Sequence, residues 1–115
     1  MRRFSLALGF ALIATPACAQ TIRPADAGAH VGQTITVEGV VSEIHTSASS
    51  GTTFIDMGGH YPDNVFTAVI FPDDARAFPN VGMLNGKTVD VIGPIRLYQG
   101  RPEIVLKAAS QLKSR

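Results

Sequence analysis

Cysteine, tryptophan and net charge are all scarce in this sequence. Its 115 residues include one cysteine, Cys18, no tryptophan, and a formal net charge of only +1. A lone cysteine excludes an internal disulfide and a zinc site built from several cysteines. The small net charge excludes a strongly basic protein, although one basic face remains compatible with it.

Patterns typical of catalysis and metal binding are missing as well. His30, His45 and His60 lie on separate predicted segments without the spacing of metal ligands. No nucleophile can be grouped with a base and a residue that orients the base. We therefore predict no catalytic residue, no metal site and no cofactor, and a protein that is not an enzyme.

The longest apolar run lies near the N-terminus, at residues 5–14 (SLALGFALIA). It is too short for a bilayer, which needs about 20 residues. The run follows Met1-Arg2-Arg3 and leads to Ala17-Cys18-Ala19, an order typical of a signal peptide that is cleaved before Gln20. We expect residues 1–19 to be removed and 20–115 to be periplasmic or secreted, without a transmembrane segment. A buried N-terminal helix and a lipid anchor on Cys18 are the alternatives.

Charge divides unevenly along the expected mature chain. Without the two arginines of the leader, 8 basic and 9 acidic residues remain, for a net charge of −1. Residues 20–74 hold seven acids and one arginine, a net of −6, whereas 75–115 hold seven bases and two acids, a net of +5. A basic face could therefore form only from the C-terminal part.

Five segments have the composition and alternation of β-strands. They are residues 34–44, 53–57, 65–71, 87–98 and 101–106. Gly39 and Gly93 interrupt the two long segments, so we expect each of these strands to bend at a glycine bulge with positive φ. Residues 72–78 (PDDARAF) predict a short helix, with acidic residues at its N-terminal end.

This order of elements favours a five-stranded Greek-key barrel of the OB-fold type. The short helix falls between the third and fourth strands, and both long strands can bend enough to close a small barrel. A β-sandwich and an SH3-like barrel are the alternatives. We expect a single OB-fold domain over residues 20–115.

Several short motifs support a resemblance to a known family. Phe54-Ile55-Asp56-Met57 resembles the tRNA-anticodon-type OB domains of nucleic-acid-binding proteins. The layout, with Gly86-Lys87-Thr88-Val89 followed by Tyr98-Gln99-Gly100-Arg101-Pro102-Glu103-Ile104, is similar to small exported bacterial OB proteins described as nucleic-acid-binding. The resemblance covers most of residues 33–107 and implies that Phe54 stacks on a base. The arginine and aspartate that usually follow the first motif are Gly58-Gly59 here, so the resemblance does not extend to specific tRNA recognition.

Strand alternation places a candidate site on the outer barrel face. If Ile55 and Met57 point into the barrel, Phe54 and Asp56 share the outer face. On the next strand, inward Phe66, Ala68 and Ile70 leave three outward residues, namely Thr67, Val69 and Phe71. OB ligands lie across these two strands, where an exposed aromatic residue can stack. The opposite parity, or packing under a loop or the short helix, would bury Phe54 instead.

The last hairpin and one loop could complete this surface. Arg96, Tyr98 and Arg101 lie within six residues, and arginine and tyrosine can bind a phosphate and stack on a base. Tyr61, on the loop after the second strand, could lie beside them. Alternatively, Tyr98 covers the barrel end, the arginines only solubilise the hairpin, and Tyr61-Pro62 stiffens a turn.

Two functional hypotheses follow. The first is a non-enzymatic exported OB module that binds single-stranded DNA or RNA, or a similar polyanion, through Phe54, Asp56, Tyr61, Thr67, Arg96, Tyr98 and Arg101. The second is a cell-envelope interaction module that binds a protein, glycan or small ligand through the same barrel face.

Overall fold

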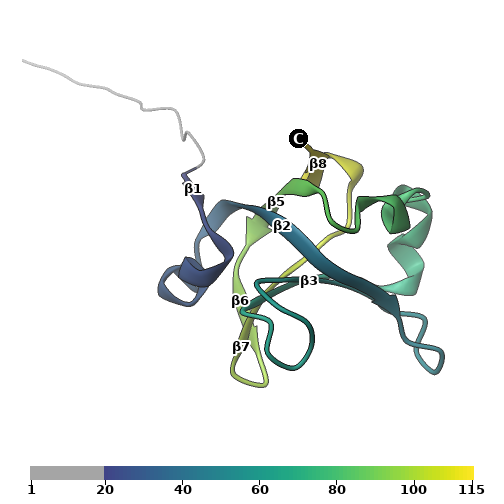
Figure 1. Ribbon diagram of the computed structural model, residues 1–115, viewed down its shortest axis with the longest axis horizontal. Helices are drawn as coiled ribbons and strands as arrows, with labels where there is room; N and C mark the ends of the chain where they lie inside the picture. The colour runs from purple at the N-terminus through teal and green to yellow at the C-terminus, as the bar shows by residue number, and fades with distance from the viewer. Residues whose placement is uncertain (1–19) are drawn as a thin grey trace, which may run out of the picture.

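The computed structural model describes residues 20–115 (Figure 1). The expected signal peptide and Cys18 lie outside the described residues. The described part is mostly β-structure, as expected, with four short 3-10 helices: η2 (Pro24–His30), η3 (Pro72–Ala77), η4 (Val81–Leu84) and η5 (Ala109–Gln111). Its strands are β1 (Thr21–Ile22), β2 (Thr34–Thr46), β3 (Thr53–Met57), β4 (Phe66–Ile70), β5 (Thr88–Pro94), β6 (Arg96–Tyr98), β7 (Arg101–Val105) and β8 (Leu112–Ser114). No helix among the described residues is long and apolar enough to cross a membrane.

The strands form one sheet that curls into a barrel-like shape. Its order is β6-β7-β4-β3-β2-β5-β8, and β1 pairs with β2. All pairs are antiparallel except β4 with β7 and β1 with β2. Only Ile95 separates β5 from β6, so strands far apart in the sheet order are joined through one residue. This connection brings the β6–β7 hairpin, at one end of the molecule in Figure 1, back toward β5 and β2.

The eight observed strands exceed the five expected ones for identifiable reasons. The expected segment 87–98 is divided at Ile95 into β5, which pairs with β2, and β6, which pairs with β7. β1 and β8 contain two and three residues, too few for any periodicity in the sequence, and pairing with β2 and β5 defines them. The predicted helix is present as η3, which begins at Pro72 and has two aspartates in its first turn.

Side-chain alternation builds the core as expected. Ile55, Met57, Phe66, Ala68 and Ile70 are all buried, which confirms the inward parity of β3 and β4. They pack with Ile35, Val37, Val89, Val91, Ile104 and Leu106 from the other strands.

Val69 lies on the outer face of β4, as expected, yet only 3% of the residue is exposed. β4 is paired on both sides, and Phe54 and Val105 are the residues opposite Val69 on the neighbouring strands. Side chains directly opposite one another share a face, so these two neighbours cover it.

The expectation that Gly39 and Gly93 form bulges with positive φ is wrong. Gly39 pairs with Val89 and Gly93 with Ile35 in an unbroken register, and neither glycine has positive φ. The register shift in β2 instead lies between Val41 and Glu43. Both glycines are needed for close packing, because a Cβ atom at Gly39 would lie 2.5 Å from Cγ of Pro24. A Cβ atom at Gly93 would lie 2.7 Å from Cγ2 of Ile104.

Replacing either glycine with valine should therefore destabilise the barrel. We expect Gly39→Val and Gly93→Val each to lower the free energy of unfolding by about 1 to 3 kcal/mol, because neighbouring groups must move apart. Gly82→Val is the matched control, since nothing lies within 4 Å of a Cβ atom at Gly82. Denaturant titration measures all three, and equal stability of the Gly39 and Gly93 variants with the control would contradict this account.

Candidate nucleic-acid interface

A groove of about 480 Å³ crosses the outer face of β3 and β4. Its walls come from the end of β2, the loop after β3 and the β6–β7 hairpin. It is lined by His45, Ser47, Phe54, Asp56, Tyr61, Thr67, Tyr98, Gln99, Arg101, Pro102 and Glu103. The volume lies within the range of small-ligand sites in proteins.

Six of the seven residues predicted for the site line this one groove. They are Phe54, Asp56, Tyr61, Thr67, Tyr98 and Arg101. The seventh, Arg96, is not among the lining residues. The other lining residues were not predicted, and the first strand was expected to end at residue 44 although β2 continues to Thr46. Glu43 and His45 are two residues apart on β2 and so share a face. Extending the predicted strand by two residues would have placed His45 on the outer face.

Strand register explains why these residues converge. Asp56 is opposite Glu43 on β2 and Thr67 on β4, Thr67 is opposite Glu103 on β7, and Glu103 is opposite Arg96 on β6. Opposite residues share a face, so one polar row crosses five strands. Three members of this row, Asp56, Thr67 and Glu103, form the floor of the groove.

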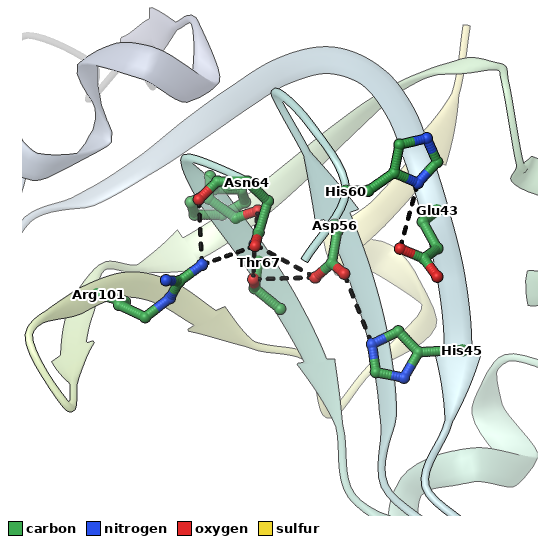
Figure 2. A network of polar contacts seen from close by, with 8 residues as sticks. Glu43, His45, Asp56, His60, Asn64, Thr67 and Arg101 are labelled. Carbon is green, nitrogen blue, oxygen red and sulfur yellow. Dashed lines mark hydrogen bonds and ion pairs between the residues drawn. The ribbon is translucent and has the colours of Figure 1, made fainter. Parts of the chain in front are cut away.

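Asp56 is at the centre of a hydrogen-bond network (Figure 2). Its Oδ1 accepts hydrogen bonds from Thr67 Oγ1 at 3.1 Å and from Asn64 Nδ2 at 3.3 Å. Its Oδ2 lies 3.5 Å from Nε2 of His45 and has no hydrogen-bond partner. The side chain is only 2% exposed, and burial raises the pKa of this carboxyl above its ordinary value, against the opposing influence of Thr67 and His45.

Phe54 lies on the outer face, half-buried, with one ring face already in contact. The ring centroids of Phe54 and His45 are 5.0 Å apart, and the ring planes are inclined by 23°, so the two rings stack. This pair results directly from the register, in which His45 is opposite Phe54.

Tyr61 and Arg101 close one side of the groove. Nη2 of Arg101 donates to Oδ1 of Asn64 at 2.6 Å and to the Asn64 carbonyl at 3.1 Å. The same guanidinium lies 5.5 Å from the centroid of the Tyr61 ring, a cation–π arrangement. Tyr61 and Tyr98 are 66% and 56% exposed, so two aromatic rings remain available to a ligand. Asn64 was not predicted, because its contact with Arg101 spans 37 residues and leaves no local signal.

The groove is not basic. Arg96 donates from Nε and Nη2 to Oε2 of Glu103, each at 2.7 Å, so its charge is balanced at the edge of the groove. Asp56 and Glu103 line the groove together with one arginine, Arg101. The surplus of bases in residues 75–115 therefore does not produce a basic face at this place.

His60 and Glu43 form a further ion pair next to the network, with Nδ1 of His60 3.3 Å from Oε1 of Glu43 (Figure 2). In the described range 20–115, no group of three His, Cys, Asp or Glu side chains is arranged to hold a metal ion. Within that range the polar partners of His30, His45 and His60 are Gln33, Asp56 and Glu43, respectively. None of these polar contacts is with a serine or threonine hydroxyl.

Comparison with known proteins supports the fold. The structure is similar to a chain described as a "putative aspartyl-tRNA synthetase from Leishmania major Friedlin", with a TM-score of 0.56 and 11% sequence identity. The match covers 87% of this chain but only 21% of the length of that chain. No protein-family model and no curated protein matches the sequence. At this identity the likeness concerns the fold alone, and it supports a barrel-like all-β fold.

The raised pKa of Asp56 leads to a prediction about stability. A carboxyl with a raised pKa in the folded state favours folding while it is protonated, and this contribution is lost as the pH rises through the folded-state pKa. Asp56→Asn keeps the size and an acceptor oxygen without the charge. We expect the variant to melt at a higher temperature than the wild type at pH 7, and the difference to vanish below about pH 3.5. A lower melting temperature of the variant at pH 7 would show that contacts of the carboxylate outweigh its burial.

Proposed function

We propose that this protein is a non-enzymatic OB module that binds single-stranded DNA or RNA in the groove over β3 and β4. One observation carries the proposal: three aromatic residues and a cation line the same groove. They are Phe54, Tyr61, Tyr98 and Arg101. These residues come from a strand, a loop and a hairpin that are distant in sequence. Aromatic rings beside a cation are the usual means of holding an unpaired strand.

Stacking, more than phosphate neutralisation, drives binding in this proposal. A stacked base contributes about 1 to 3 kcal/mol. Arg101 is the lining cation that can contact a phosphate, and the carboxylates of Asp56 and Glu103 repel phosphates from the floor. The bases therefore point into the groove, and the backbone follows its rim near Arg101.

A second candidate function is favoured by the same acidic floor. Buried carboxylates at the centre of a groove disfavour a polyanion, so an envelope protein, a glycan or a small ligand could occupy it instead. Both proposals give the protein a binding role without catalysis.

Export is a further part of the proposal. The order of charge, apolar run and small residues in 1–19 supports cleavage before Gln20, so that the mature barrel acts in the periplasm or after secretion. Mass spectrometry of the exported protein should show a chain that begins at Gln20. An intact Met1, or a lipid on Cys18, would contradict this part without affecting the binding proposal.

Variants of groove residues test the binding proposal. Phe54→Ala should weaken binding of a fluorescent mixed-sequence single strand by about 1 to 3 kcal/mol, with little change in salt dependence, because a stacking contact is lost. Arg101→Gln should lower the slope of log affinity against log salt by up to about 0.7, because one fewer counterion is released.

Arg96→Gln is the matched control for Arg101→Gln. Arg96 is paired with Glu103 and does not line the groove, so its loss should change the salt slope less. Fluorescence anisotropy measures the affinities, and melting temperatures show whether each variant is folded. Unchanged affinity in folded Phe54→Ala and Arg101→Gln would exclude this groove as the binding site.

A further inference from the structure

The groove floor contains one acceptor atom that the protein itself does not satisfy. Oδ1 of Asp56 accepts two hydrogen bonds, whereas Oδ2 accepts none although the side chain is 2% exposed. A buried polar atom without a partner is unfavourable, and natural proteins seldom keep one without a functional reason. A ligand that donates a hydrogen bond to Oδ2 would remove this cost.

Nε2 of His45 lies 3.5 Å from Oδ2 but forms no hydrogen bond with it, and the other groups around Asp56 do not supply that donor. Glu43 and Glu103 are acidic neighbours on β2 and β7, and Thr67 and Asn64 already donate to Oδ1. The guanidinium of Arg101 is directed at Asn64. A phosphate would be repelled here, so the ligand must present N–H groups to the floor.

The position of His45 shows which ligand shape fits. Its imidazole is a flat nitrogen heterocycle that stacks on Phe54. Nε2 of this ring lies 3.5 Å from Oδ2 of Asp56 (Figure 2). The His45 side chain is 40% exposed, so the ring is not enclosed by the protein. Another flat heterocycle with N–H groups on one edge could take the same place.

We propose that the groove preferentially binds guanine, whose ring replaces the His45 imidazole on Phe54 and whose N1–H and N2–H groups donate to the carboxylate of Asp56. This inference rests on the proposed binding of single strands and names the base that they present. Guanine is the nucleobase with two neighbouring N–H donors on its pairing edge. Adenine and cytosine place a ring nitrogen lone pair beside their amino group, and thymine and uracil flank one N–H with two carbonyls. Each of these would direct an acceptor at the carboxylate.

The test uses short DNA strands that differ at one position. A single guanine, inosine or thymine is flanked by abasic nucleotides, and the affinity of the purified protein for each strand is measured by anisotropy. Guanine should bind at least about tenfold more tightly than thymine, the scale of discrimination by a good two-point contact to a base. Inosine lacks the N2 amino group and should bind more weakly than guanine.

Three variants assign the preference to Asp56 and His45. Asp56→Asn should remove the preference for guanine, whereas Asp63→Asn, an exposed acid outside the groove lining, should retain it. His45→Ala should bind guanine as tightly as the wild type or more tightly, because no ring has to be displaced. If Asp56→Asn does not fold, the affinities of the wild type for the guanine, inosine and thymine DNA strands still test the preference for guanine.

Each contrary outcome has a separate meaning. Equal affinity for guanine, inosine and thymine would overturn the guanine site and leave single-strand binding intact. Weaker binding by folded His45→Ala would overturn the replacement of His45. Competition by trilysine at the concentration of the guanine strand would show that the floor binds ammonium groups instead. Absence of binding to every strand, mixed sequence included, would overturn the proposed function together with this inference.

Discussion

Strand β3 is hydrogen-bonded on both sides, and its register determines the core and the groove together. Ile55 and Met57 are fully buried in the core, while Phe54 and Asp56 face outward between β2 and β4. A shift by one residue would place the Asp56 carboxylate among apolar side chains and expose Ile55 to water. The free energy of burying the core therefore also fixes the floor of the groove.

The same register explains the electrostatic character of the groove. Acids from the N-terminal half, Glu43 and Asp56, lie in one row with Glu103 and Arg96 from the C-terminal half. The parallel pairing of β4 with β7 joins the two halves, so the charges that are separated in the sequence mix on the surface. Basic residues nearer the C-terminus form ion pairs outside the groove. Arg115, for example, pairs with Glu38 and Asp90. The binding that we propose for this groove therefore depends on stacking and on hydrogen bonds to base edges, which are less sensitive to salt than phosphate contacts are.

Alternation was sufficient to predict the longer strands, the inward residues of β3 and the outward position of Phe54, Asp56 and Thr67, but not the short strands β1 and β8. It predicts one strand at a time, so it could not show that Val69 is covered by Phe54 and Val105, or that Asn64 receives the Arg101 guanidinium. The glycines illustrate the same limit. Their positions were identified, but the reason for them depends on Pro24 and Ile104, which approach only in the folded chain.

The central claim is that unpaired bases bind over β3, β4 and the β6–β7 hairpin. Nuclear magnetic resonance titration with a guanine-containing single strand at low salt tests it most directly, because each amide reports on its own surroundings. The account predicts shifts of amides around Phe54, Thr67 and Arg101, and little change at β8 on the edge of the sheet. An unchanged spectrum at millimolar strand, or shifts confined to β8 and η4, would contradict it.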